Sequence, residues 1–232
     1  MQLEYDVIIL GAGASGMTAA LAVHENGSSV GLFEKQDVIG GTAGISGGII
    51  WAPNNSHMKV EGIEDDRQKA IDYFMSLSNN DIDQNLLESF VDNCASAIDF
   101  IEEKTEAKFY ILEGYPDYYL DRPGAIEGGG RALDNKLFDF VELGDWSKKV
   151  RNNGMPIPMT LGETPLGGGT GFVDEAVMNE RISKDSRGMG QALVGALLKG
   201  CLDKGIEPHL EINTKRLLKE GDRIAGIEID ND

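Results

Sequence analysis

Three glycines near the start of the chain, Gly11, Gly13 and Gly16, have the spacing G-x-G-x-x-G. In this pattern the first glycine allows a tight turn, the second lets a pyrophosphate approach the backbone, and the third lets a helix pack closely on the preceding strand. The amides at the helix start then face the phosphates. Glu34 follows at roughly the 20-residue spacing at which an acidic side chain binds a ribose hydroxyl. Together these residues predict a dinucleotide site.

The elements around these glycines are those that such a site requires. The apolar run 7–10 has no polar alternation, which is typical of a parallel strand covered on both faces. A helix is expected over residues 14–26, with Gly27 ending it, and a second strand over residues 29–34. The glycines alone would fit a turn in an unrelated α/β protein equally well. The strand, the helix and the acid after them favour dinucleotide binding.

A second glycine-rich segment, residues 40–48, follows Lys35 and contains two glycine pairs with hydroxyl side chains between them. A flexible loop is the alternative interpretation. Exposed amides and small hydroxyls, however, suit a second approach of the backbone to a cofactor. Plain nicotinamide-binding domains have no such requirement directly after the ribose-binding acid, so the segment favours FAD over NAD.

Composition narrows the class of protein. With 232 residues, 41% of them hydrophobic and 26% charged, the chain is expected to fold around a substantial core. Its formal net charge of −18 argues against a nucleic-acid or anionic-membrane partner, since both attract basic surfaces. No run approaches the roughly 18 apolar residues of a membrane span. The glycine pattern occupies the apolar stretch 7–23 and no basic leader precedes it, so we expect a cytoplasmic protein.

The cysteines and histidines give no indication of a metal site. Cys94 and Cys201 each fall in an apolar helical pattern and are expected to be small core residues in a reducing compartment. His24, His57 and His209 have no ligand spacing. We therefore expect no metal.

The rest of the chain alternates helices with short strands. Helical periodicity predicts helices over residues 65–77, 84–104, 174–182 and 188–204. Strands are expected at 108–112 and 206–212, and a hairpin from 216–219 and 224–229 around a Gly-Asp turn. Residues 124–170 are rich in glycine and proline and are expected to form irregular loops.

Four tyrosines gather between Tyr110 and Tyr119, with Tyr115 and Tyr118 between them. A surface turn with packed rings is one interpretation, because Gly114, Pro116 and Asp117 favour turns. The other is the aromatic wall of a flat, apolar binding site.

With these motifs in view, the chain resembles the succinate dehydrogenase/fumarate reductase flavoprotein superfamily, and within it the 3-ketosteroid Δ1-dehydrogenases. The superfamily likeness rests on residues 5–35, on the segment 40–48 and on Ile50-Trp51-Ala52-Pro53-Asn54. The closer likeness rests on three further motifs. These are Tyr115-Pro116-Asp117-Tyr118-Tyr119, Leu143-Gly144-Asp145-Trp146 and Met189-Gly190-Gln191-Ala192-Leu193. The similarity covers essentially the whole chain.

The resemblance implies an α/β fold, a Rossmann-like FAD-binding domain with a parallel sheet, helices on both faces and a C-terminal β-hairpin. Residues 1–232 would form this one domain, the N-terminal portion of the family pattern. A substrate-binding domain, a segment that closes over the flavin and the catalytic tyrosine base would follow Asp232. The chain alone is therefore expected to be inactive.

The resemblance also assigns residues to FAD. The acid Glu34 would bind the adenosine ribose, with Lys35 beside it. The pyrophosphate would be held by Gly11, Gly13, Ala14, Ser15 and Gly16. The flavin side would be lined by Gly40, Gly41, Thr42, Ala43, Ser46, Gly47 and Gly48. The segment 213–216 is shorter than in the family and lacks the apolar residue that contacts adenine.

For the substrate, Tyr118 matches the family tyrosine that assists the tyrosine base. Tyr115 matches an aromatic residue that packs on the steroid, Ile49 falls where a substrate-lining residue lies, and Tyr119 is expected to pack. The implied reaction is 1,2-dehydrogenation of a 3-ketosteroid, in which a tyrosinate removes a proton next to the carbonyl and the flavin accepts a hydride. Tyrosine has a pKa of about 10, so this base needs help to ionise near neutral pH. A hydroxyl donor such as Tyr118 would stabilise the phenolate.

Two alternatives remain open. The first is a fumarate-reductase-like enoate reductase, which would act on small carboxylates through arginine and histidine. The second is a non-catalytic remnant that binds FAD weakly or not at all. The aromatic segment around Tyr115 and Tyr118 favours the steroid-like substrate. The expected partners are this small molecule and an electron acceptor of unknown kind.

Overall fold

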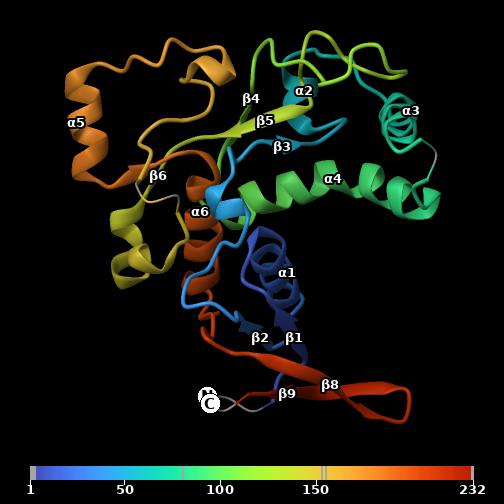
Figure 1. Ribbon diagram of the computed structural model, residues 1–232, viewed down its shortest axis with the longest axis vertical. Coiled ribbons are helices and arrows are strands. Elements are labelled where there is room, and N and C mark those ends of the chain that lie inside the picture. Colours follow the sequence, from blue (N-terminus) through green and yellow to red (C-terminus); the bar gives the residue numbers. More distant parts are fainter. Residues whose placement is uncertain (1–3, 80, 153, 155, 231–232) are drawn as a thin grey trace.

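The computed structural model describes residues 4–79, 81–152, 154 and 156–230 (Figure 1). Strand β1 (Val7–Leu10) pairs in parallel with β2 (Val30–Phe33). Helix α1 (Ala14–Glu25) connects the two strands, and Gly27 follows it with φ +78°, the left-handed conformation that ends helices. The predicted strand, helix and strand are confirmed.

A further segment continues this sheet beyond β2. Phe33 forms a parallel bridge with His209. The Glu34 amide donates to the His209 carbonyl at 2.8 Å, and the Ile212 amide donates to the Glu34 carbonyl at 2.9 Å. The strand expected at 206–212 is thus reduced to a bridge, yet it occupies the position of a third parallel strand.

A second, antiparallel sheet has the order β3–β5–β4. Its strands are β3 (Ile50–Trp51), β5 (Ala132–Asn135) and β4 (Phe109–Ile111). β4 was expected, but β5 lies within the stretch 124–170 for which loops were predicted, so that prediction is wrong there. All four β5 residues are buried, and the strand is specified by its distant partners rather than by its own four residues.

Residues 124–170 contain three more ordered pieces: a two-residue strand, a long 3₁₀ segment and a short 3₁₀ turn. Strand β6 (Phe138–Asp139) pairs with β7 (Ser186–Arg187), and the 3₁₀ segment η2 spans Phe140–Lys149. Two shorter 3₁₀ turns are η1 (Ala43–Ile45) and η3 (Pro165–Gly167).

The predicted helices are confirmed within one or two residues at each end. They are α3 (Arg67–Leu77), α4 (Gln84–Lys104), α5 (Glu175–Ser183) and α6 (Met189–Asp203). A short helix that was not predicted, α2 (Ser56–Val60), precedes them. Asp66, Asp83 and Asp174 cap α3, α4 and α5 by accepting backbone amide hydrogens. No helix in the described part of the chain is long and apolar enough to cross a lipid bilayer.

Helix α6 is the central, mostly buried helix of the fold. Eleven of its residues are buried, and it packs against α1, η1, η2 and β5. Figure 1 shows it running from the antiparallel sheet down to the parallel one, beside α1. The hairpin β8 (Thr214–Glu220) and β9 (Arg223–Ile229) lies at the lower end, next to β1 and β2. Its turn contains Gly221 and Asp222, as predicted.

Candidate functional site

A cavity of about 470 Å³ lies at the carboxyl ends of β1 and β2. We call it the dinucleotide cavity, after the ligand that the sequence predicts for these residues. Open α/β sheets bind ligands at this end of their parallel strands. The predicted residues Gly11, Gly13, Glu34, Lys35 and Gly41 all line it. The other lining residues are Leu10, Phe33, Gln36, Val38, Arg151, Ile212, Asn213 and Thr214.

Glycine is needed for different structural reasons at different positions of the G-x-G-x-x-G pattern. A Cβ on Gly16 would lie 1.9 Å from the Gly11 carbonyl oxygen, so Gly16 is required for packing of α1 on the strand end. A Cβ on Gly13 would meet nothing closer than the Gly40 carbonyl at 3.9 Å. Protein packing therefore leaves the space at Gly13 free for a ligand.

The start of α1 is suited to a pyrophosphate. Gly13 is the N-cap and has no side chain to bond the first amides, and the first turn holds no acidic residue. The first amides of a helix lack intrahelical partners and carry a partial positive charge. The residues present therefore fit the diphosphate of a dinucleotide.

Glu34 directly follows β2, its side chain is turned toward the glycine turn, and the residue is 8% exposed. One carboxylate oxygen accepts the Ala12 amide hydrogen at 2.9 Å, and the other accepts that of Gln36 at 3.0 Å. Each carboxylate oxygen has a further lone pair. Glu34 thus fixes the glycine turn and can still accept a hydrogen bond from a ribose hydroxyl in the cavity.

The segment 40–49 leads from this cavity along α6 toward the antiparallel sheet. Gly40 donates its amide hydrogen to the Ala12 carbonyl at 2.9 Å, and Gly190 donates its own to the Ser46 carbonyl at 3.1 Å. A Cβ on Gly48 would lie 2.4 Å from the Met189 carbonyl carbon. Gly41 and Gly47 have no heavy atom within 3.5 Å of such a Cβ, so these two keep room for a ligand.

The other predicted cofactor residues lie outside the cavity lining. Thr42 and Ala43 begin the η1 turn, and the Ser46 hydroxyl donates to the Ala43 carbonyl at 2.8 Å. Ala14 and Ser15 line an apolar groove of about 580 Å³ between α1 and α4. They remain next to the α1 N-terminus, where the pyrophosphate is expected.

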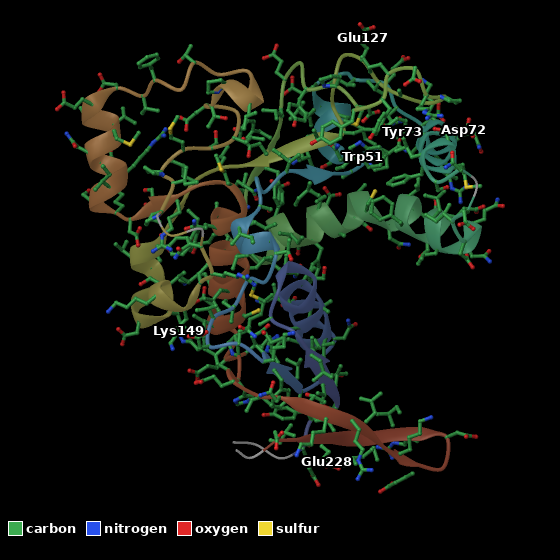
Figure 2. The ribbon with its side chains drawn as sticks, in the orientation of Figure 1. Trp51, Asp72, Tyr73, Glu127, Lys149 and Glu228 are labelled. Carbon is green, nitrogen blue, oxygen red and sulfur yellow. The ribbon has the colours of Figure 1, made fainter. Side chains whose placement is uncertain are left out.

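A second pocket, of about 330 Å³, contains Ile49, Tyr115 and Tyr118, the three predicted substrate residues. We call it the aromatic pocket. Its other lining residues are Trp51, Tyr73, Phe74, Leu77, Pro116, Asp117, Tyr119 and Ala132. Figure 2 shows Trp51 and Tyr73 near each other, between β3 and α3.

The two tyrosines predicted to contact substrate are within hydrogen-bond distance of each other through their hydroxyls. The Tyr115 and Tyr118 oxygens are 3.3 Å apart, and their rings meet edge to face with centroids 6.2 Å apart. The hydrogen bond with Tyr118, together with partial burial, raises the pKa of Tyr115. Tyr118 itself is 79% exposed, so its hydroxyl is open to a group approaching from outside this chain.

Several lining residues were not predicted as part of a site. Arg151 reaches the dinucleotide cavity because the Ile39–Val150 bridge brings the basic run 148–151 beside it. Ile212 lines this cavity directly before the segment 213–216, in which the sequence lacks the apolar residue expected at adenine. Trp51 and Phe74 line the aromatic pocket, although the helical periodicity around Phe74 indicates a core residue.

The cysteines are placed as expected, in the core. Cys201 is fully buried and Cys94 is partly buried, and neither is in a disulfide. Burial raises the pKa of the Cys94 thiol to about 11 and that of Cys201 to about 12. Within the described ranges, no group of three or more His, Cys, Asp or Glu side chains could hold a metal ion.

Known proteins share this architecture. A 4-oxocyclohexanecarboxylate 2-dehydrogenase from Sinomonas cyclohexanicum is 32% identical over 230 residues, 96% of this chain and 40% of that protein. A 3-oxosteroid 1-dehydrogenase from Mycolicibacterium smegmatis is 29% identical, over 97% of this chain and 42% of that protein. The chain thus spans about two fifths of the length of these curated relatives.

The same relation appears among solved structures. A 3-ketosteroid Δ1-dehydrogenase from Sterolibacterium denitrificans, solved with 1,4-androstadiene-3,17-dione, superimposes with a TM-score of 0.81 at 29% identity. The match covers 97% of this chain and 44% of that one. Residues 6–232 also match the family described as FAD binding domain. The chain therefore belongs to the FAD binding domain family, and its cofactor is FAD.

Proposed function

We propose that the complete protein is an FAD-dependent oxidoreductase that 1,2-dehydrogenates a 3-ketosteroid-like ring. The observation that carries this proposal is the aromatic pocket, in which Ile49, Tyr115 and Tyr118 come together. The segment 40–49 runs from the dinucleotide cavity to this pocket. A flat apolar ring in the pocket would then lie near a cofactor held along the segment.

In this proposal FAD occupies the cavity at β1 and β2. Bound FAD supplies a hydride acceptor. The α1 N-terminus, residues 11–16, binds its pyrophosphate, Glu34 accepts a ribose hydroxyl, and Lys35 and Arg151 lie beside them at the cavity. Residues 40–43 and 46–48 present small side chains and backbone amides toward the flavin side.

Tyr118 has the role of assisting a base. Removal of a proton next to a ketone by a phenolate requires that the phenolate be stabilised, since tyrosine ordinarily ionises near pH 10. The exposed Tyr118 hydroxyl can donate to such a phenolate, while Tyr115, whose hydroxyl lies 3.3 Å away, holds the Tyr118 hydroxyl in place. The base itself would come from the part of the protein beyond this chain.

The lining of the aromatic pocket favours an uncharged ring over a carboxylate. Among the described residues that line it, none is Lys, Arg or His, and Asp117 is the charged one. A carboxylate placed there would lose hydration and would find no cation in the lining to pair with. The 32% identity to the dehydrogenase named for 4-oxocyclohexanecarboxylate nevertheless makes a smaller cyclic keto acid the second candidate.

The test uses the full-length protein, purified and assayed with an artificial electron acceptor. We expect a yellow protein with one FAD per chain that oxidises a 3-ketosteroid faster than 4-oxocyclohexanecarboxylate and does not reduce fumarate. Preference for the keto acid would support the second candidate. Reduction of fumarate without any ketone oxidation would support the enoate reductase instead, and a flavin-free protein that binds NADH would contradict the proposal altogether.

A further inference from the structure

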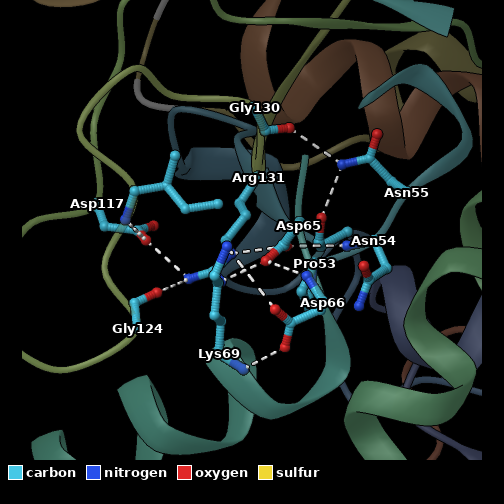
Figure 3. A network of polar contacts seen from close by, with 12 residues as sticks. Pro53, Asn54, Asn55, Asp65, Asp66, Lys69, Asp117, Gly124, Gly130 and Arg131 are labelled. Atoms are coloured by element: carbon cyan, nitrogen blue, oxygen red, sulfur yellow. Dashed lines mark hydrogen bonds and ion pairs between the residues drawn. The ribbon is translucent and has the colours of Figure 1, made fainter. Parts of the chain in front are cut away.

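Arg131 is a buried charged side chain near the aromatic pocket, with 1% of its surface exposed. It directly follows the glycine run Gly128–Gly130. The guanidinium lies between two acidic side chains from different loops, Asp65 and Asp117 (Figure 3). These carboxylates are themselves 1% and 3% exposed.

The hydrogen bonds of Arg131 use the fork shape of the guanidinium. Nε and Nη2 bond the two oxygens of Asp65 at 2.8 and 2.6 Å. Nη1 bonds Asp117 Oδ2 at 2.8 Å and the Gly124 carbonyl at 2.9 Å. Burial alone would lower the pKa of Arg131, but the bonds and charges of Asp65 and Asp117 raise it, so the cation is retained. A lysine ammonium cannot reproduce this planar set of bonds.

Asp117 connects this cation to the substrate residues. It stands between Tyr115 and Tyr118 in the chain, with its other oxygen accepting the Trp51 indole hydrogen at 2.7 Å. It also accepts the Ile126 amide hydrogen at 2.9 Å. The carboxylate is therefore held by three donors, and the tyrosines project from a fixed point.

Two aromatic rings, those of Trp51 and Tyr73, lie against the Arg131 guanidinium. The Arg131 guanidinium carbon lies 5.1 Å from the centre of the Trp51 ring and 5.9 Å from that of Tyr73. Trp51 and Tyr73 stack with centroids 6.0 Å apart, and the Tyr73 hydroxyl accepts the Tyr119 amide hydrogen at 3.2 Å. Trp51 and Tyr73 both line the aromatic pocket.

The glycines before Arg131 permit this arrangement. Gly129 has φ +80°, and a Cβ there would lie 2.8 Å from the Tyr115 carbonyl oxygen. Gly130 has φ +121°, and its carbonyl accepts a hydrogen from the Asn55 side-chain nitrogen Nδ2 at 3.1 Å. The turn therefore sits directly against the Tyr115 backbone while it aims Arg131 at Asp117.

We infer that Arg131 is a positioning residue, which acts through Asp117 to hold Tyr115 and Tyr118 at the mouth of the aromatic pocket. The inference rests on the proposed function of that pocket. It adds a residue that never touches the substrate but sets the place of those that do. A bidentate arginine is required, because one cation must hold Asp65 and Asp117 at once.

The experiment uses the FAD-loaded full-length protein with Trp146→Phe, so that Trp51 is the single tryptophan left within residues 1–232. Any tryptophan elsewhere in the full-length protein is replaced by phenylalanine as well. Arg131→Lys keeps the charge and removes the fork. We expect a shifted Trp51 emission, a Kd for a non-reactive ring ketone that rises about tenfold, and unchanged FAD content. Asp117→Asn should move both readouts in the same direction, and it decides the question if Arg131→Lys does not fold.

The matched control is Arg181→Lys. Arg181 also makes a bidentate pair, with Glu163 at 2.6 and 2.9 Å, but it does not line the aromatic pocket. This variant should leave Trp51 emission and ring-ketone binding unchanged. If folded Arg131→Lys and Asp117→Asn bind the ketone as the parent does, the positioning role is wrong while the proposed function stands. If the parent binds no ring ketone, both are wrong.

Discussion

The dinucleotide cavity draws most of its lining from one continuous stretch, residues 10–41, whereas the aromatic pocket collects side chains from residues as far apart as Ile49 and Ala132. The first has glycines in its lining, Gly11, Gly13 and Gly41, and the Ala12 amide of its glycine turn is held by Glu34. The second is built from rings and is held by the buried charges of Arg131, Asp65 and Asp117. The dinucleotide cavity is defined mostly by local sequence, and the aromatic pocket by long-range contacts.

This difference predicts where a single substitution should be most costly. Arg131→Met leaves the Asp65 and Asp117 carboxylates buried without their cation. Loss of one partner of a buried ion pair typically costs about 3 to 5 kcal/mol, so we expect the free energy of unfolding to fall by about this amount in denaturant titrations. Arg67→Met, which breaks exposed ion pairs with Glu88 and Asp92, should change the free energy of unfolding little. An equal effect of the two variants would contradict the asymmetry between buried and exposed pairs.

The second prediction separates packing from ligand binding within the dinucleotide cavity. Gly16→Ala places a Cβ 1.9 Å from the Gly11 carbonyl oxygen and should destabilise the protein by roughly 1 to 3 kcal/mol even without FAD. The new Cβ in Gly13→Ala would meet no protein atom closer than 3.9 Å. The free energy of unfolding of this variant without FAD should therefore stay within about 0.5 kcal/mol of the parent value.

The same two variants should differ in flavin retention, with Gly13→Ala now the more affected variant. Gly13→Ala should lose FAD during gel filtration, because its methyl group occupies space needed for the pyrophosphate. If Gly13→Ala retains FAD as well as the parent does, the pyrophosphate does not approach at Gly13 and the assignment of the α1 N-terminus is wrong.

The contrast between the two regions also explains what could be predicted from sequence. The β1–α1–β2 unit follows from glycine spacing, an uninterrupted apolar strand and a helix ended by Gly27, all within about 30 residues. The family motifs single out Ile49, Tyr115 and Tyr118, and these three line one pocket. Which residues support them was not predictable, because Trp51 and Arg131 meet Asp117 only after β3 and β5 have paired.

The wrong prediction of a loop at the position of β5 has the same cause. β5 has four residues, Ala132 to Asn135, too few for any periodicity, and it is flanked by Arg131 and Lys136. Its burial comes from its place between β3 and β4 and from helix α6, which packs against it. The charge of Arg131 resembles a surface feature in the sequence, since buried arginine occurs only with partners that the sequence does not reveal.

The third prediction probes the chemistry of the aromatic pocket. Tyr118→Phe in the full-length protein removes one hydrogen bond to a charged partner, worth about 1.5 to 3 kcal/mol. Ketosteroid oxidation should therefore slow by about one to two orders of magnitude, with FAD content and unfolding unchanged. Tyr119→Phe is the control, because Tyr119 contacts Tyr73 through its backbone amide rather than its hydroxyl. Greater sensitivity at Tyr119 would reverse the assignment of the pair.

The smallest predicted effect concerns acid and the loop behind the aromatic pocket. Glu163 is partly buried, which raises its pKa, but hydrogen bonds from Arg181 and from the Thr160 amide outweigh burial and lower it below the ordinary value of 4.5. A carboxyl group with a lowered pKa in the folded state stabilises the protein above its unfolded pKa, and this contribution disappears as the pH falls through the folded value. The loss should therefore begin near pH 4.5 and be complete only at lower pH.

Its size is limited because Arg181 and Glu163 are 17% and 31% exposed, so we expect about 1 kcal/mol or less. Glu163→Gln should lower the Tm at neutral pH by about 2 to 4 °C, and the difference from the parent should shrink toward zero as the carboxyl group becomes protonated. Thermal unfolding followed by circular dichroism across this pH range measures both. A Tm difference that stays constant with pH would mean that packing of Glu163, rather than its charge, stabilises the loop next to Tyr110 and Asp134.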